Sequence, residues 1–337
     1  MIDVFRFVGA FMVVTIHIGF PGLWIRGVYF PLTRLAIPFF FMVSGYFLAD
    51  QDMERMKQRL TKQIKNIFWV LIAALLAYFV FDLALTAIQN PGKVYDHVKV
   101  LWTWGRWYRL IAINDTRPFY GPHLWYLSAQ LYAMVAIRLA LEYHKLQRLV
   151  WVAALALLAV PLLIWQKGQA VPLALIRNFL LVGIPCVMAG AWMKLNTERI
   201  LKWPRKLVIC LPIAFTLLTL GERWLWFLWL GHSSLTLYVN GLLLAASLIV
   251  LSMHFPAAGE RTVFSKWGAD HSLMIYIAHM MPVYLFGAVA KAWGFARSPW
   301  YQWTAPVLVF ALSLGIAMVW GWGKGKLKWR KRVKAEG

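Results

Sequence analysis

The sequence predicts an all-α, polytopic integral membrane protein. Apolar side chains make up 61% of its 337 residues and charged side chains only 14%, whereas an ordinary soluble domain is roughly 25% charged. The mean hydropathy is +0.62, and apolar stretches long enough to cross a bilayer recur along the chain. A soluble fold of this size could not keep so much apolar surface from water. The composition therefore excludes a disordered chain, a disulfide scaffold and nearly all soluble enzymes.

About ten stretches come close to the roughly 20 mostly apolar residues that a transmembrane helix needs. They are residues 4–21, 30–49, 67–88, 122–141, 149–165, 171–193, 207–221, 233–254, 268–287 and 303–322. A further apolar stretch, 224–232, either lengthens the eighth span or lies in the membrane interface. We therefore expect one transmembrane domain over residues 1–322, followed by a basic tail over 323–337.

Basic residues predict the orientation of the chain. Lys and Arg number 35 against 13 acidic residues, a formal net charge of +22. With the N-terminus inside, 22 basic residues lie in segments predicted to face the cytoplasm and 11 in segments predicted to face outward. The positive-inside rule therefore places both termini and the basic tail in the cytoplasm. The same excess suits contact with anionic membrane lipids, and no nucleic acid partner is expected.

The sequence contains no motif for a bound metal or cofactor. It lacks H-E-x-x-H, C-x-x-C, a P-loop and G-x-G-x-x-G. Its two cysteines, Cys186 and Cys210, lie in or beside apolar runs without metal or redox spacing, which is typical of small core residues. We therefore expect no bound metal or cofactor.

Ionisable side chains in the first span are the strongest candidates for chemistry, because such groups at membrane depth are costly and usually face protein or water. Arg6 and His17 are separated by three helical turns, so both project from one face about 16 Å apart. Asp3 lies one turn before Arg6 and is expected to pair with it. The imidazole of His17 could exchange a proton near pH 7. The alternatives are a packed histidine and a snorkelling arginine.

Two later spans also carry polar residues in a helical pattern. Ser272, Tyr276 and His279 follow one another at steps of four and three in the ninth span. We expect this stripe to face the same interior as the first span. Ser44 and Gly45 in the second span form a small patch on which another helix can pack closely. No G-x-S-x-G surrounds Ser44, so packing is favoured over a nucleophilic role.

The long segment 89–121, predicted to face outward, is rich in Trp, Tyr and Arg. It leads into His123 and Trp125 at the start of the fourth span. One interpretation is an aromatic belt at the membrane interface. The other is a platform for a glycan, with arginines placed to bind phosphate or carboxylate.

Two further sites combine arginine with a polar or acidic neighbour. Arg177 lies toward the outer end of the sixth span, where it either snorkels or binds an anionic group. Glu222 and Arg223 form an acid–base pair predicted to follow the seventh span on the outside. An exposed pair of this kind contributes little to stability, and the alternative is a part in acceptor binding.

Together these motifs resemble the membrane-bound acyltransferase 3 family. The resemblance rests on Arg6-x10-His17, Pro38-Phe-Phe-Phe-Met-Val-Ser44-Gly45-Tyr46, His123-Leu-Trp125-Tyr-Leu127 and Ser272-x3-Tyr276-x2-His279. Their order, the number of spans and the two cytoplasmic ends agree with that family. The resemblance covers nearly the whole chain, including all of the expected transmembrane domain, and is closest to stand-alone members.

The resemblance implies a membrane O-acyltransferase of the bacterial cytoplasmic membrane. Members move acyl groups, most often acetyl, from a cytoplasmic thioester to hydroxyls of envelope glycans. It implies that His17 is the essential histidine and Arg6 its paired basic residue. Acetyl-CoA would be the donor substrate, with its phosphates held by Arg6, Lys57, Arg59 and Lys62. An envelope polysaccharide or a lipid-linked sugar would be the acceptor.

The remaining candidates are expected to line the pore or the acceptor site. They are Asp3, Ser44, His123, Trp125, Arg177, Glu222, Arg223, Tyr276 and His279. His17 would act as a general base on the acceptor hydroxyl or accept the acetyl group itself, and the sequence leaves both routes open. The competing function is a multi-pass transporter or flippase for an envelope precursor, since interior charges also suit a substrate path. No internal repeat of the kind common in secondary transporters supports it.

Overall fold

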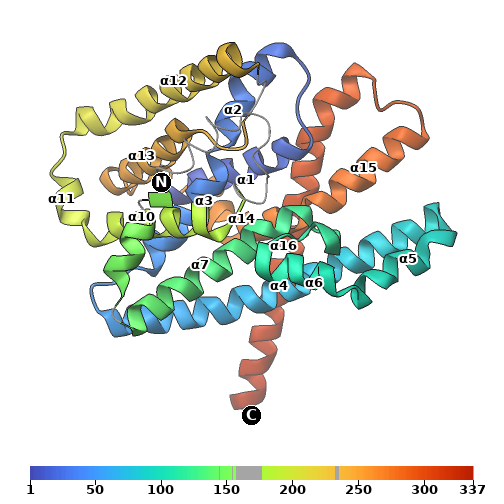
Figure 1. The fold of residues 1–337 in the computed structure, drawn as a ribbon, viewed down its shortest axis with the longest axis horizontal. Helices are drawn as coiled ribbons and strands as arrows, with labels where there is room; N and C mark the ends of the chain where they lie inside the picture. The colour runs from blue at the N-terminus through green and yellow to red at the C-terminus, as the bar shows by residue number, and fades with distance from the viewer. Residues whose placement is uncertain (144, 154, 157–176, 232–234, 337) are drawn as a thin grey trace. The chain divides into compact units, whose positions relative to one another are not determined.

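The fold is that of a computed structural model, which describes residues 1–143, 145–153, 155–156, 177–231 and 235–336. All regular structure within these ranges is helical, and they hold no β-strand. The predicted all-α class is therefore confirmed. Figure 1 shows the helices in chain order.

Five helices of the described ranges are long and apolar enough to cross a membrane, and a bent pair of helices makes six if it is one span. The five cover Ile25–Leu48, Met53–Gln89, Pro122–Glu142, Arg205–Trp229 and Pro299–Gly323. Two shorter apolar helices cover Phe179–Leu195 and Val239–His254. These are the helices of a multi-pass membrane protein, whereas the count of ten spans and the cytoplasmic termini stay predictions.

The structure describes the following helical elements. In chain order they are α1 (Ile2–His17), η1 (Ile25–Tyr29), α2 (Phe30–Thr33), α3 (Ala36–Leu48), α4 (Met53–Gln89), η2 (Pro91–Lys93), α5 (Val94–Val98), η3 (Lys99–Trp102), α6 (Trp104–Ile113), η4 (Arg117–Phe119), η5 (Pro122–Leu124), α7 (Trp125–Glu142), η7 (Phe179–Gly183), α10 (Ile184–Leu195), α11 (Thr197–Leu201), α12 (Arg205–Leu230), α13 (Val239–His254), α14 (Val263–Ala278), α15 (Met280–Ala292) and α16 (Pro299–Glu336). The predicted span 149–165 and the first part of 171–193 lie largely outside the described residues.

The chain divides into two compact units. Unit 1 holds Met1–Ala36 and Leu251–Gly337, and unit 2 holds Ile37–Val250. In unit 1, α1 packs along α14, which also packs against α16; in unit 2, α4 runs beside α7 (Figure 1). The two ends of the chain therefore build one unit, and the first-span and ninth-span motifs belong to it together.

Unit 1 is held by a close contact between α1 and α14. A Cβ at Gly268 would lie 1.8 Å from the carbonyl oxygen of Asp3, so only glycine lets the two backbones approach this closely. Phe7 fills the space beside this contact. Its ring centroid lies 5.3 Å from that of Phe264 and 5.3 Å from that of Phe310 on α16. Aromatic packing thus joins the three helices.

Unit 2 contains a reciprocal glycine contact between α3 and α10. A Cβ at Gly45 would lie 1.8 Å from the carbonyl oxygen of Val187, and a Cβ at Gly190 would lie 1.8 Å from that of Met42. Each glycine therefore receives the backbone of the facing helix. This confirms the expectation that the small patch at Ser44 and Gly45 accepts a neighbouring helix.

Two predicted span boundaries are wrong. One helix ends earlier than predicted and another continues further. The helix predicted over 4–21 ends at His17, since Gly19, Pro21 and Gly22 (φ +107°) follow. The described part of the stretch 224–232 lengthens the seventh span, not the eighth. It continues α12 to Leu230, where Gly231 adopts φ +66° and closes the helix.

The predicted span 268–287 is also broken in the middle. It consists of α14 and α15, which are bent by 49° at His279. Pro282 lies in the first turn of α15. Proline has no N–H and its ring displaces the carbonyl four residues earlier, so a straight helix cannot continue through this point.

Candidate active site

Two histidines from opposite ends of the chain lie side by side in unit 1. His17 is the last residue of α1, and His279 lies at the break between α14 and α15. Their ring centroids are 5.1 Å apart, with the ring planes inclined at 46°. His17 is exposed, whereas His279 is fully buried. One imidazole is therefore open to a ligand, and the other is enclosed by protein.

A backbone hydrogen bond determines which nitrogen of His279 carries its proton. Nδ1 lies 2.7 Å from the carbonyl oxygen of Tyr276. Because a carbonyl oxygen only accepts, Nδ1 donates, and the neutral ring then has its lone pair on Nε2. Tyr276 and Ser272 are both buried, so the polar stripe of α14 faces protein. The structure thus brings this stripe and the histidine of α1 into one place.

Arg6 is held on α1 by two acceptors. Its Nη1 donates to Asp3 Oδ1 at 2.7 Å, the pair that the sequence predicted, and its Nη2 lies 3.3 Å from the carbonyl oxygen of Ala269 on α14. The Arg6 side chain is 22% exposed. At the rise of an α-helix, Arg6 lies about 16 Å from His17 along α1. The guanidinium is therefore oriented but still open to a ligand.

The other residues expected to bind the donor phosphates belong to unit 2, and two of them are paired with carboxylates. Lys57 Nζ lies 2.7 Å from Glu54 Oε1, and Arg59 Nη2 lies 3.0 Å from Asp50 Oδ2. Lys62 is exposed and makes no ion pair within the described part of the chain. These pairs reduce the positive field at the start of α4 that a polyphosphate would meet.

Ser44 has the contacts of a packing residue. Its hydroxyl donates to the carbonyl oxygen of Phe40 at 2.9 Å, one turn earlier in α3. The same oxygen accepts from Nε2 of Gln130 on α7 at 2.7 Å. The hydroxyl therefore links α3 to α7, in agreement with the packing role favoured by the sequence.

His123 and Trp125 secure the start of α7. His123 is buried, and its ring stands edge-on to that of Tyr78 on α4 with centroids 4.6 Å apart. The carbonyl oxygen of Trp125 accepts from Nδ2 of Asn114 at 3.2 Å, which ties the preceding loop to the helix. Both residues thus have structural contacts inside unit 2.

The loop 89–121 contains an arginine–aspartate–arginine cluster that the sequence analysis did not single out. Asp115 accepts from Arg109 Nη2 at 2.7 Å and from Arg117 Nε at 2.8 Å. Burial raises the pKa of Asp115, but hydrogen bonds from the two guanidinium groups outweigh it and hold the pKa below its ordinary value. Exposed Trp102 and Trp104 lie in the same loop. The spacing Arg-x5-Asp-x-Arg is the sequence signal that could have predicted this cluster.

A buried aspartate–histidine pair also escaped the sequence analysis. His97 on α5 is buried, and its Nδ1 lies 3.3 Å from Asp82 Oδ2 on α4. Its ring stacks on Tyr120 with centroids 4.0 Å apart. The two residues lie on different helices, so a regular helical spacing in the sequence could not predict the pair. Neither this pair nor any other set within the described ranges forms a group of three His, Cys, Asp or Glu that could hold a metal ion.

Arg177 does not lie inside a helix, contrary to the prediction. The helix η7 begins at Phe179, and the side chain of Asn178 caps it by accepting from the amide of Leu181 at 2.8 Å. Asparagine favours this capping position over the helix interior, which explains why the helix starts after Arg177. The Arg177 side chain is partly exposed.

Glu222 and Arg223 are not the exposed ion pair that the sequence suggested. Both lie within α12, because the apolar stretch after them continues the helix. The carboxylate of Glu222 accepts from the amides of Val239 and Asn240 at 2.8 Å each. Arg223 is only 8% exposed. The two neighbouring side chains therefore do not pair with each other: Glu222 binds the start of α13, and Arg223 is buried elsewhere.

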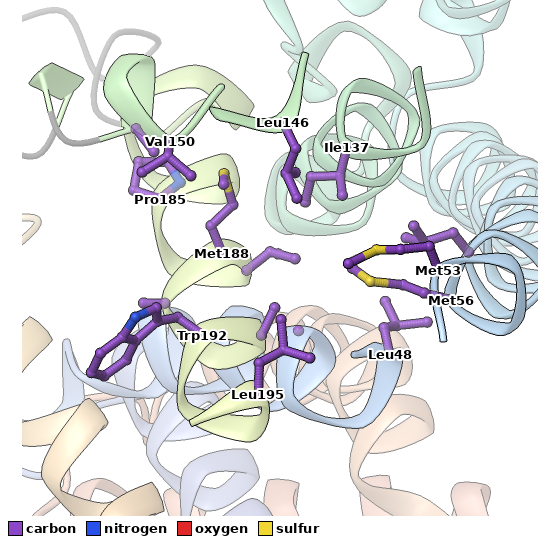
Figure 2. Close-up of a pocket in the computed structure, with 16 residues that line it drawn as sticks. Leu48, Met53, Met56, Ile137, Leu146, Val150, Pro185, Met188, Trp192 and Leu195 are labelled. Carbon is purple, nitrogen blue, oxygen red and sulfur yellow. The ribbon is translucent and has the colours of Figure 1, made fainter. Parts of the chain in front are cut away.

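Unit 2 contains an apolar cavity of about 300 Å³. Figure 2 shows Met53 and Met56 on one side of it and Met188 and Leu195 on another. Its lining side chains come from α3, α4, α7, α10 and residues 146–153, and none of them is titratable. The cavity suits an apolar chain but supplies no group for proton transfer.

Comparison with known proteins identifies one family over most of the chain. The family model described as an acyltransferase domain (Acyl_transf_3) matches residues 1–322. A serine/alanine racemase from Enterococcus gallinarum is 30% identical over 161 residues, which are 45% of this chain and 21% of that protein. An amino-acid racemase from Enterococcus faecalis is 30% identical over 150 residues, 42% of this chain and 19% of that protein. The chain thus spans about a fifth of these relatives, and no solved structure matches it.

Proposed function

This chain belongs to the acyltransferase 3 family and is an acyltransferase, and from this we propose that it carries acetyl from cytoplasmic acetyl-CoA to a hydroxyl of a cell-envelope glycan or lipid-linked sugar. The proposed location is the bacterial cytoplasmic membrane. The observation that supports the site is the exposed imidazole of His17 beside the buried ring of His279, 5.1 Å away, on the helix that carries Arg6.

In the direct route, the acceptor hydroxyl gives its proton to His17 as its oxygen attacks the thioester carbonyl carbon. The C–O bond forms, the C–S bond breaks, and the CoA thiolate takes the proton from the imidazolium. In the covalent route, a ring nitrogen of His17 first attacks the thioester carbonyl carbon, the C–S bond breaks, and CoA leaves as the thiol with the proton of the imidazole. The acceptor hydroxyl then attacks this acyl-imidazole, the C–N bond breaks, and the hydroxyl proton returns to the ring. Both routes need an imidazole that a ligand can reach, and His17 meets this condition.

His279 is proposed as a positioning residue for His17. Its Nδ1 is committed to the Tyr276 carbonyl, so its orientation is fixed by the end of α14. The buried ring of His279 limits how the exposed ring of His17 can rotate. Because Nδ1 of His279 faces the Tyr276 carbonyl, Nε2 of His279 faces away from Tyr276. The bend between α14 and α15 supports this role, because α14 ends at Ala278 and His279 is the residue that follows.

Arg6 is proposed to bind the phosphates of the donor. Asp3 and the Ala269 carbonyl engage part of its guanidinium and fix its direction. The separation of about 16 Å from His17 is comparable to the length of a pantetheine arm. A phosphate on the free edge of Arg6 would therefore leave the thioester within reach of His17.

The proposal is tested with purified full-length protein, labelled acetyl-CoA and membranes that contain the acceptor. Wild-type protein is expected to label the acceptor, and His17→Ala to lose at least about a hundredfold in rate. His271→Ala on α14 is the matched control. Acceptor labelling by His17→Ala equal to wild type would remove His17 from the mechanism. Absence of acetyl-CoA turnover by wild type would remove acetyl-CoA as the donor.

A further inference from the structure

The C-terminal part of α12 holds a charged residue that the acyl-transfer site does not use. α12 covers Arg205–Leu230 and is one of the helices able to cross a membrane. Arg223 lies within this helix, two turns before its end at Gly231. A charged side chain at such a position is expected to face protein or a polar ligand, because its exposure to lipid is costly.

The adjacent carboxylate is not available to neutralise Arg223. Glu222 accepts from the amides of Val239 and Asn240 and from Nδ2 of Asn240, at 2.8, 2.8 and 2.9 Å. The two amides open α13, so the carboxylate caps that helix and lies at the positive end of its dipole. Three donors and a helix terminus thus occupy Glu222.

The guanidinium of Arg223 is buried without an acceptor. The residue is 8% exposed, and Nε and Nη1 have no hydrogen-bond partner among the described residues. Its Cζ lies 4.6 Å from the ring centroid of Trp224 and 5.4 Å from that of Phe227. The aromatic faces attract the positive charge, but they provide no oxygen to accept the N–H groups that lie in the plane of the guanidinium. They therefore offset only part of the cost of burying the charge. An anionic oxygen is the missing partner.

We propose that Arg223 binds a phosphate carried on a membrane lipid. The guanidinium carries five N–H donors, and those on Nε and Nη1 have no partner among the described residues, whereas a phosphate offers several anionic oxygens that can accept them. The aromatic rings beside Arg223 exclude water and strengthen such a contact. The phosphate has two sources, the headgroup of a phospholipid or the phosphate of a lipid-linked glycan. The second source rests on the proposed function, since it makes this phosphate part of the acyl acceptor.

The test measures binding without acyl transfer, so that it stands apart from the acetyl-CoA experiment. Full-length protein in phosphatidylcholine nanodiscs is melted alone, with phosphatidylglycerol, with a polyprenyl diphosphate and with the uncharged polyprenol. A ligand that binds the folded state raises the midpoint by an amount that grows with the logarithm of its concentration above Kd. The variants are Arg223→Gln, Arg223→Lys and, as the matched control, Arg205→Gln, which removes an exposed arginine from the other end of α12.

Wild type and Arg205→Gln are expected to be stabilised by a phosphate-bearing lipid and not by polyprenol. Arg223→Gln should lose this shift, and Arg223→Lys should need at least tenfold more lipid phosphate to reach the same shift as wild type. Arg223→Gln should also melt no lower than wild type in phosphatidylcholine alone, because it removes a buried charge that lacks a partner. A shift with both lipids indicates a headgroup site, and a shift with polyprenyl diphosphate alone indicates the glycan carrier.

Three results would overturn the proposal. The first is a wild-type protein that no phosphate-bearing lipid stabilises. The second is an unchanged shift in Arg223→Gln. The third is an Arg223→Gln protein that melts below wild type or does not fold in phosphatidylcholine alone, since the guanidinium would then be a structural group already satisfied by the protein.

Discussion

The imidazole rings of His17 and His279 lie 5.1 Å apart, although they come from opposite ends of the chain. The contact follows from the pairing of α1 with α14, which Gly268 permits by receiving the carbonyl oxygen of Asp3. One helix pair therefore positions both histidines, and it also holds Arg6 through the Ala269 carbonyl. Changes at any of these residues should affect the transfer reaction in separable ways.

His279→Asn is expected to lower kcat for acetyl transfer by about tenfold to a hundredfold and to leave the KM for acetyl-CoA unchanged. The asparagine amide can still donate to the Tyr276 carbonyl, but it no longer presents a ring to His17. Steady-state kinetics with labelled acetyl-CoA measures both constants. His271→Asn, on the same helix, is the control. A rise in KM with kcat unchanged would contradict the positioning role.

Arg6→Gln is expected to raise the KM for acetyl-CoA by about tenfold with little change in kcat, because it removes a charge-assisted contact to phosphate. Acetyl-pantetheine lacks the nucleotide phosphates. With this short donor, the variant and wild type should react at the same rate. Arg26→Gln, an exposed arginine of unit 1, serves as control. A variant equally impaired with both donors would show that Arg6 acts on the structure of α1.

Gly45→Ala is expected to destabilise the protein by about 3 kcal/mol, at the upper end of the usual cost of overpacking. The added Cβ would meet the Val187 carbonyl oxygen at 1.8 Å, so α3 and α10 must separate. Gly221→Ala is the matched control, because a Cβ there meets nothing within 4 Å and alanine favours the helix. Thermal unfolding in detergent compares the two. Equal midpoints for both variants would rule out the close helix contact.

Asp115→Asn is expected to cost about 1–2 kcal/mol at pH 7, a range that allows for solvent screening of the half-exposed arginines. The folded-state pKa of Asp115 lies below its ordinary value, so its stabilisation is present above the unfolded pKa of about 4. It is lost as the pH falls through the folded-state pKa.

The unfolding midpoint of wild type should therefore fall toward that of Asp115→Asn as the pH decreases below about 4. Asp96→Asn, at an exposed position in the same loop, should follow wild type at every pH. A gap between wild type and Asp115→Asn that stays constant from pH 7 to pH 3 would show that the carboxylate charge is not the cause.

Composition and short-range spacing predicted the properties that depend on residues close together in the sequence. Apolar composition predicted the helical membrane class, and the turn between Asp3 and Arg6 predicted their ion pair. The motif spacing also pointed to the family before the match over residues 1–322. Helix ends were less predictable. Gly19 and Pro282 mark the two places where helices end or bend, but hydropathy alone extended the predicted spans across both residues.

The sequence by itself determined that the chain is helical and apolar, and which ionisable side chains are candidates for chemistry, because these properties depend on side chains within a few turns of each other. Only the tertiary structure decided that His17 meets His279, that Glu222 caps α13, and that Arg223 is left buried without an acceptor. Such outcomes depend on how closely distant helices pack. That packing is decided by contacts such as those of Gly268 and Gly45, which no periodicity along one helix records.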